Sequence, residues 1–299
     1  MPLEIDSATD HVDFFDRLLA FLQSSTPGPE WTLLDLDTGG LSALFVSPGM
    51  SSLESIYYGF SLHEDVGLDT YALGQWMFRD YNAALAHLAQ PGHSGVKYLP
   101  LWNTAMPYWF VANAQRLMIV SKVSTTYQSS YVGKFLPQGT PGEYPQPYYL
   151  AAPVDAPTVR WSTISESHRN FWDPGIAAIM SLPGAIWRQV INFFEASGEN
   201  GADATNYVWP FNSNVNSFNS LVRYREFRDN VDGSYSLWPL LLLGENPDID
   251  IYGELDGAFA VSGFNNASEN VVEIGGDDYL VVQNMHRTAR FYYAAIKLE

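Results

Sequence analysis

The densest group of acidic side chains lies near the end of the chain and could bind a hard cation through carboxylate oxygens. Its members are Glu245, Asp248, Asp250, Glu254 and Asp256. If the calcium loop of an EF-hand is aligned to begin at Asp248, however, Tyr252 falls at a ligand position and Phe259 replaces the bidentate glutamate. The sequence therefore favours a solvated turn between strands over a metal site.

The histidines and serines lack the spacing of known catalytic motifs. The 6 histidines form no His-x-x-x-His or His-x-His pair. His63 is followed directly by Glu64 and Asp65, but adjacent residues of a strand point to opposite faces, so the three side chains are poorly placed to act together. The segment most similar to the Gly-x-Ser-x-Gly motif of a nucleophile elbow, residues 92–95, has the wrong spacing. We therefore expect that the protein is not an enzyme and binds no cofactor.

Three arginines form the one basic cluster of the sequence. Arg223 and Arg225 would share a face of a strand, and Arg228 follows them. Guanidinium groups in this arrangement could grip a phosphate, or they could pair with carboxylates of this chain or of a neighbouring subunit. Because the chain carries 33 acidic residues, ion pairs are the favoured interpretation.

The overall charge argues against several classes of partner. The 299 residues include 15 basic and 33 acidic side chains, and the net charge of −18 repels nucleic-acid phosphates and anionic membranes. No apolar run approaches the roughly 18 residues of a membrane-spanning helix, and the first residues lack the layout of a secretory signal. We expect no specific nucleic-acid binding, no membrane insertion, and a protein that is made and used in water.

The composition also predicts the fold class. Aromatic residues make up 15% of the chain, and charged residues make up 16% against roughly 25% in an average soluble domain. Short aromatic and β-branched runs alternate with Gly, Pro, Asn and Asp, which is typical of antiparallel strands joined by turns. We predict a mainly β protein with antiparallel sheets, sandwich-like or barrel-like, with a short N-terminal helix and long loops rich in Pro and aromatic residues or in Asn and Ser.

Four regions follow from this pattern. Residues 1–29 are expected to form an N-terminal helix and linker, 30–136 a β-rich lobe, 137–219 an irregular region, and 220–299 a C-terminal β lobe that packs with the first lobe. These boundaries rest on shifts in composition, since no internal repeat with a fixed period is present.

The N-terminal helix is predicted from about Asp10 to Ser24, with Ser7 or Thr9 as its cap, because apolar residues recur at three- and four-residue steps. Phe14 and Phe21 widen its apolar face. This face could cover a sheet of the same subunit or dock on a neighbour.

Two further segments carry specific expectations. Residues 81–89 predict a second helix, because alanine and leucine recur there without β-branched residues. Residues 137–157 contain six prolines among tyrosines, and proline fixes φ and removes a hydrogen-bond donor. We expect no regular sheet there, but a rigid extended arm that presents Tyr144, Tyr148 and Tyr149 outward.

Five stretches resemble a family of tail-associated virion proteins from tailed bacteriophages. They are residues 100–113 (Pro-Leu-Trp-Asn-Thr-Ala-Met-Pro-Tyr-Trp-Phe-Val-Ala-Asn), 119–127, 133–145, 252–264 and 281–290. The resemblance implies a structural part of a virion, in the tail, neck or baseplate, which is assembled in the host cytoplasm as a homo-oligomer. Its partners would be copies of itself and neighbouring virion proteins, and the family supplies no catalytic residues to carry over.

Such a role predicts contact residues and leaves two alternatives. Aromatic and arginine side chains dominate protein interfaces, and the candidates are Phe14, Phe21, Trp102, Tyr108, Trp109, Tyr144, Tyr148, Tyr149, Arg223 and Arg225. Trp102 and Trp109 would fit a protein core equally well. The alternatives are a receptor- or carbohydrate-binding module, which would use exposed aromatic rings, and a cell-envelope glycoside hydrolase, which needs two carboxylates about 5 to 9.5 Å apart.

Overall fold

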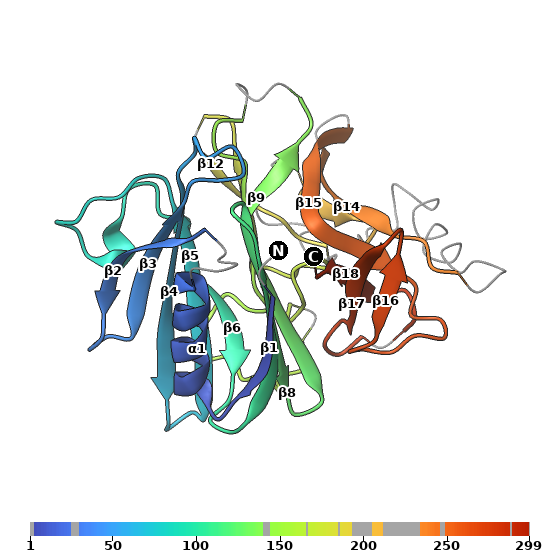
Figure 1. The fold of residues 1–299 in the computed structure, drawn as a ribbon, viewed down its shortest axis with the longest axis horizontal. Coiled ribbons are helices and arrows are strands. Elements are labelled where there is room, and N and C mark those ends of the chain that lie inside the picture. The colour runs from blue at the N-terminus through green and yellow to red at the C-terminus, as the bar shows by residue number, and fades with distance from the viewer. Residues whose placement is uncertain are drawn as a thin grey trace.

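Three layers of antiparallel strands lie side by side in the computed structural model of the chain (Figure 1). The structure describes residues 3–24, 30–139, 144–165, 167–184, 186–192, 205–211, 234–245, 249–287 and 289–298. The prediction of a mainly β fold built from antiparallel sheets with a short N-terminal helix is confirmed.

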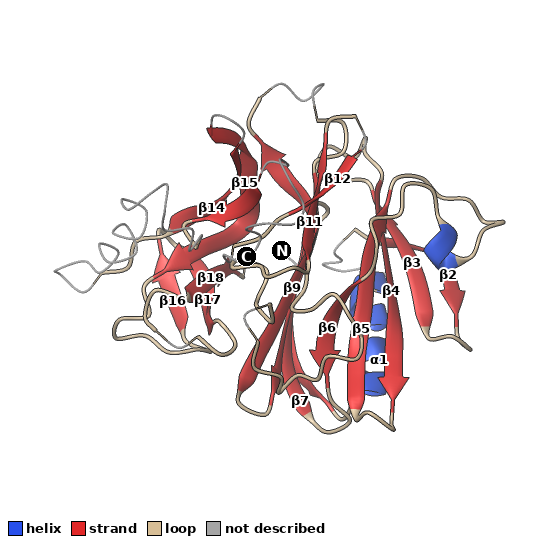
Figure 2. Cartoon of the chain, turned by 180° about the vertical axis from the view of Figure 1, so that it is seen from behind, coloured by secondary structure: helices blue, strands red, loops and turns tan. Residues whose placement is uncertain are grey.

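The first layer is a sheet of five strands in their order along the chain. Its strands are β2 (Thr32–Asp37), β3 (Ser42–Ser47), β4 (Ile56–Asp65), β5 (Thr70–Phe78) and β6 (Lys97–Leu101). The middle layer contains β1 (Leu3–Ala8), β7 (Met106–Ala112), β8 (Arg116–Val123), β9 (Thr126–Pro137), β10 (Tyr148–Ala151), β11 (Ala178–Leu182) and β12 (Ile186–Gln189). Seen from behind, β9, β11 and β12 lie between the first sheet and the C-terminal strands (Figure 2).

The third layer continues the hydrogen-bonded path of the middle one, because the end of β9 pairs with β15. Its strands are β13 (Thr205–Trp209), β14 (Trp238–Glu245), β15 (Ile249–Val261), β16 (Val271–Ile274), β17 (Asp277–Gln283) and β18 (Tyr293–Lys297). A turn at Gly275 and Gly276 joins β16 to β17, and both glycines have the positive φ that such turns require. The strand expected to carry Arg223 and Arg225 lies outside the described residues.

The central strands of the middle layer, β7 to β10, are buried on both faces, whereas β1 and β12 are largely exposed. Along β8, Leu117 and Ile119 face a core shared with the helix and the first sheet, whereas Met118 and Val120 face a second core shared with the third layer. Successive side chains of a strand alternate between faces, so a strand that is covered on both sides can be apolar at nearly every position, as β7 and β10 are. Strand β9 instead buries polar side chains such as Gln128.

Helix α1 (His11–Gln23) fills the core between the first sheet and the middle layer, and Phe14 and Phe21 lie within it. The predicted helix is confirmed, but its cap differs. Asp10, rather than Ser7 or Thr9, accepts hydrogen bonds from the backbone N–H groups of Val12 and Asp13, both at 2.9 Å. Asp10 is extended, as an N-cap residue should be.

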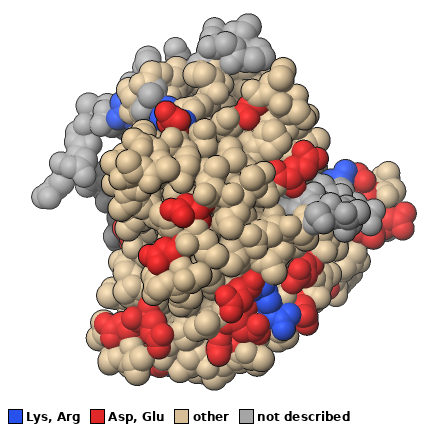
Figure 3. All heavy atoms as spheres, turned by 60° about the vertical axis from the view of Figure 1, so that its left-hand side comes forward, with Lys and Arg blue, Asp and Glu red and all other residues tan. Residues whose placement is uncertain are grey.

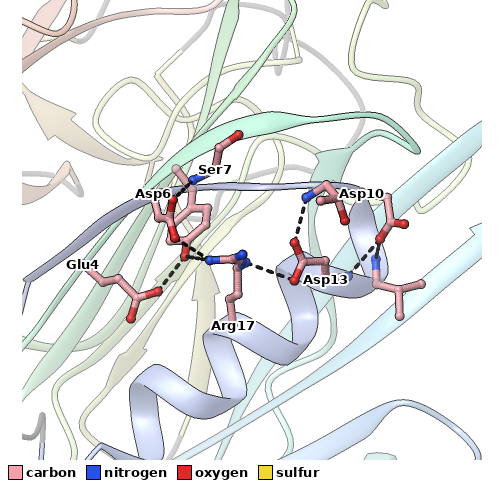
Figure 4. Close-up of polar contacts among 9 residues, drawn as sticks. Glu4, Asp6, Ser7, Asp10, Asp13 and Arg17 are labelled. Carbon is pink, nitrogen blue, oxygen red and sulfur yellow. Dashed lines mark hydrogen bonds and ion pairs between the residues drawn. The ribbon is translucent and has the colours of Figure 1, made fainter.

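Polar contacts hold β1 to this helix (Figure 4). Arg17 donates to Asp6 of β1 at 2.5 Å and to Asp13 of its own helix at 3.0 Å. The Tyr108 hydroxyl of β7 donates to Glu4 at 2.6 Å. The backbone N–H of Ser7, followed by the Arg17 guanidinium, lowers the pKa of Asp6. The acidic residues around α1 therefore position the first strand of the middle layer.

Two of the local predictions are wrong. Residues 81–89 hold only a 3-10 turn, η1 (His87–Ala89). The buried side chain of Gln90 donates to the carbonyls of Asn82, Leu85 and Ala86 at 3.1 to 3.3 Å, and so binds acceptors that an α-helix would use for its own backbone. The expectation of no regular sheet in 137–157 is also wrong. Strand β10 begins directly after Pro147 and pairs with both β9 and β11.

A buried ion pair joins the middle and third layers. Arg116 Nε lies 2.9 Å from Asp256 Oδ2, and the two side chains are 1% and 24% exposed. Asn113 Nδ2 donates to the same carboxylate oxygen at 3.0 Å. Gly257 has φ +67°, and a Cβ there would lie 1.9 Å from Arg116 Nη2. The chain thus needs glycine beside this arginine for both conformational and steric reasons.

Replacing Asp256 by alanine is expected to lower the free energy of unfolding by about 3 to 5 kcal/mol, because it leaves a buried guanidinium without its carboxylate. The control is Asp277→Ala, which breaks the more exposed Lys297–Asp277 pair at 2.6 Å and should cost no more than about 1 kcal/mol. Urea denaturation measures both. Equal effects of the two substitutions would contradict the structural importance of the Arg116 contact.

Candidate functional site

Most of the aromatic side chains predicted as contact residues lie inside the chain. The buried ones are Phe14, Phe21, Tyr108, Trp109, Tyr148 and Tyr149. Tyr108 and Trp109 are neighbours in β7, but they face the two different cores, and so do Tyr148 and Tyr149 in β10. A contact with another protein would require these rings to leave a core, so we do not include them in a contact surface.

The remaining predicted contact residues have different positions. Trp102 is half-buried and packs on Trp161 with ring centres 5.0 Å apart. Tyr144 is half-buried and meets Phe135 at 6.3 Å. Arg223 and Arg225 lie outside the described residues. Of the three tyrosines that were expected to point outward from 137–157, Tyr144 is partly at the surface, and Tyr148 and Tyr149 are buried.

Among the described residues, the acidic and histidine candidates do not converge on a site. The solvated turn expected for the acidic group is also wrong for Asp250, Glu254 and Asp256, which belong to strand β15. Asp256 is held by Arg116, and Asp248 lies outside the described residues. Glu64 contacts His11 Nε2 at 3.3 Å rather than its neighbour His63. Within the described ranges, no three His, Asp or Glu side chains lie close enough together to hold a metal ion.

A different group of residues meets at one end of the molecule. We call it the upper end, from its position in Figure 1: it comprises the β3–β4 loop (residues 48–55), Arg79 after β5, residues 144–147, and the β11–β12 hairpin with its turn at Pro183 and Gly184. The antiparallel order explains the meeting, because β3, β5, β9 and β11 all run toward this end. Turns far apart in the sequence are thereby brought together.

Two adjoining cavities open at the upper end. The larger, of about 300 Å³, is lined by Arg79, Tyr144, Pro145, Gln146, Ser181, Leu182 and Gly184. The smaller, of about 260 Å³, is lined by Leu53, Glu54, Ser55, Ile56, Lys134, Pro145, Gln146 and Tyr148. Pro145 and Gln146 form the wall between them, so the segment between two prolines shapes both cavities.

Arg79 is held rigidly in the larger cavity. Its Nη1 donates to Gln146 Oε1 at 3.2 Å and its Nη2 to Ser181 Oγ at 2.9 Å. The guanidinium carbon lies 5.2 Å from the ring centre of Trp187, a cation–π distance. Burial lowers the pKa of Arg79, and the Tyr148 hydroxyl acts weakly in the opposite direction. Arginine nevertheless remains charged in proteins, so this cavity presents a fixed positive group.

The smaller cavity contains a lysine and a glutamate whose charges neutralise each other. Lys134 Nζ lies 2.7 Å from both carboxylate oxygens of Glu54. The Tyr148 hydroxyl closes its inner side by donating to the Ser55 carbonyl at 2.8 Å. Three exposed apolar side chains belong to the upper end, and we call them its apolar rim: Leu53, 91% exposed, lines the smaller cavity, Met50, 64% exposed, lies in the same loop, and Ile186, 46% exposed, begins β12. The upper end therefore combines exposed apolar side chains with Arg79, which has no carboxylate partner among the described residues.

The sequence holds only a weak signal for this site. The signal is the position of Arg79, a single basic residue that directly follows the fully buried strand β5 in an acidic chain. Its partners Gln146 and Ser181 lie 67 and 102 residues further along. No local motif could have connected them.

A buried polar segment, residues 168–173, lies beneath the second core. The Asp173 carboxylate accepts hydrogen bonds from Arg169 Nη1 at 3.1 Å and from Asn284 Nδ2 at 3.0 Å. Asn170 Oδ1 accepts from the backbone N–H of Ser129 at 3.0 Å. Asn170 thus binds the backbone of β9, and Asp173 binds two buried polar side chains, so the polar groups of this segment satisfy one another and the neighbouring strand.

His168 belongs to the same segment. It is 2% exposed, and its ring nitrogens contact the Thr163 carbonyl at 2.7 Å and Gln128 Oε1 at 3.0 Å. Burial lowers the pKa of His168 to about 4, the Thr163 carbonyl opposes this, and nearby His286 lowers it further. The folded chain thus holds a neutral imidazole.

No protein-family model matches the chain, and no curated protein matches its sequence. Among the described helices, none is long and apolar enough to cross a membrane. Function must therefore be argued from the residues of this chain.

His168 predicts acid sensitivity. The unfolded imidazole has a pKa near 6.5, so as the pH falls from about 6.5 to about 4 the unfolded state binds the proton first and the free energy of unfolding decreases. The expected decrease in the free energy of unfolding over this pH range is about 3 kcal/mol. Denaturation of the wild type and of His168→Gln between pH 7 and pH 4 measures it. The variant should lose this part of the pH dependence, and identical slopes for both proteins would contradict a buried neutral His168.

Proposed function

We propose that this chain is a structural component of a bacteriophage virion, in the tail, neck or baseplate, and acts through protein–protein contacts in a homo-oligomeric assembly. Its partners would be copies of itself and neighbouring virion proteins, brought together in the host cytoplasm. The observation that carries the proposal is the exposed apolar rim of the upper end, where Leu53 is 91% exposed and Met50 64%. Large exposed apolar side chains that belong to one end of a molecule are typical of interaction sites.

The charge distribution supports contacts with protein. Only 16% of the residues are charged, and the face seen in Figure 3 shows a mostly uncharged surface with separate acidic groups and few basic side chains. The cores of protein interfaces are depleted in charged residues. A net charge of −18 also disfavours retention of nucleic acid by such a surface.

The cavities give less support to the two alternatives. A glycoside hydrolase needs two carboxylates across its cleft, whereas the residues lining these two cavities include one, Glu54, and Lys134 neutralises it. A carbohydrate-binding module needs free ring faces, whereas Trp102 and Trp161 pack on each other. The non-enzymatic assembly role is therefore the proposal we retain.

Light scattering of the purified chain tests the proposal. We expect the wild type to form an oligomer with a mass that is a multiple of 33.4 kDa. The double variant Leu53→Glu with Ile186→Glu should shift the mass to that of the monomer, because it places charges on the contact surface.

The matched control is Ile164→Glu. Ile164 is 81% exposed, but its loop lies near the β4–β5 turn, to which Arg160 is joined by an ion pair with Asp69. This turn is at the end of the molecule opposite the upper end (Figure 1). The control should keep the wild-type mass. A wild type that stays monomeric at all concentrations, or a control that dissociates like the double variant, would reject the proposal.

A further inference from the structure

We propose that the larger cavity of the upper end binds a carboxylate of an acidic peptide segment, with Arg79 as the group that receives it. The inference deepens the proposed function, on which it rests for the choice of a protein as partner. The site itself stands on the chemistry of its lining and can be tested with small peptides.

Most of the described Lys and Arg side chains are paired with a carboxylate, and Arg79 is not. Seven of them have a carboxylate oxygen within 3.1 Å: Arg17, Arg116, Arg160, Arg169, Lys122, Lys134 and Lys297. Arg79 has no carboxylate partner among the described residues, although the chain carries 33 acidic side chains. Its bonds go to the neutral groups of Gln146 and Ser181. Within the described part of the chain, the positive charge in the cavity is therefore available to an external anion.

The guanidinium is also oriented before any ligand binds. Two of its five N–H groups are used by Gln146 and Ser181. The Nε atom is buried and has no hydrogen-bond partner within the described chain. A buried donor without a partner costs about 1 to 3 kcal/mol, and a carboxylate could engage such an arginine through two parallel hydrogen bonds.

The arginine stem cannot easily move away. It packs against Gly92, where an added Cβ would lie 2.5 Å from Arg79 Cδ. Trp187, which lies under the guanidinium, is itself fixed by a hydrogen bond from its indole N–H to the Gly92 carbonyl at 3.0 Å. Preorganised groups of this kind lose little entropy on binding.

The rest of the lining favours a peptide over a sugar acid. Gln146 uses its carbonyl oxygen for Arg79 Nη1 and its amide nitrogen for the Arg79 carbonyl at 3.2 Å. The other walls are largely apolar, from Pro145 and Leu182. Sugar hydroxyls would therefore find few polar partners. A volume of about 300 Å³ accommodates an acidic side chain together with an apolar neighbour.

Isothermal titration of the full chain with two dipeptides tests the site. The probe is N-acetyl-Phe-Asp-amide, and the matched neutral probe is N-acetyl-Phe-Asn-amide. We expect the acidic probe to bind in the millimolar range, and at least tenfold more tightly than the neutral one. Arg79→Gln should lose at least tenfold in affinity for the acidic probe, and Arg79→Lys should lose several-fold, since lysine keeps the charge but lacks the planar fork.

The matched control is Arg160→Gln. Arg160 also lies over a tryptophan ring, at 5.9 Å from Trp161, but it is paired with Asp69. This control should bind the acidic probe like the wild type. If Arg79→Gln fails to fold, Arg79→Lys decides the question, and unchanged affinity in that variant would overturn the site.

Two other outcomes would overturn the inference. Equal affinity for the acidic and neutral probes would show that Arg79 does not recognise the carboxylate. Tighter binding of glucuronate than of the acidic dipeptide would replace the peptide by a sugar acid. The titration is carried out at a chain concentration at which light scattering finds the monomer, because the assembled contact would cover the cavity. Failure of this monomer to bind the acidic probe rejects the site alone, whereas probe binding by a chain that stays monomeric at all concentrations rejects the assembly role alone.

Discussion

The burial of the middle layer on both faces is the constraint on which the rest of the structure depends. In β8 and β9, neighbouring side chains enter different cores, such as Leu117 and Met118. Such a layer is stable only if other elements cover both sides. The first sheet and α1 cover one side, and the third layer covers the other. The connections between layers are then polar and specific, through Arg116 with Asp256 and through the segment around Asn170.

This arrangement explains where the aromatic residues are and where the contact surface lies. Most of the aromatic side chains, including Tyr108, Tyr148 and Tyr149, pack into the two large cores between the three layers. The surface available for partners is then found where strands end rather than on the faces of the sheets. At the upper end, the exposed side chain of Leu53 and the charge of Arg79 lie around adjoining cavities. A contact built there would combine apolar burial with one specific charge.

Local patterns in the sequence predicted the elements whose stabilising contacts are local. The three- and four-residue recurrence of apolar residues identified α1. The sequence could not predict which side chains face outward, because Tyr108 and Trp109 are both buried although they point to opposite faces. The expected helix at 81–89 is replaced by contacts from the side chain of Gln90. The Arg79 cavity depends on residues about a hundred positions apart, for which spacing carries no information.

The account makes the upper end the surface that other proteins cover. Hydroxyl-radical footprinting of the assembled and the dissociated protein tests this claim most directly. Met50 at the upper end is 64% exposed, and Leu68 in the β4–β5 turn at the opposite end is 58% exposed. We predict that assembly protects Met50 from oxidation and leaves the oxidation of Leu68 unchanged. Protection of Leu68 with undiminished oxidation of Met50 would contradict the account.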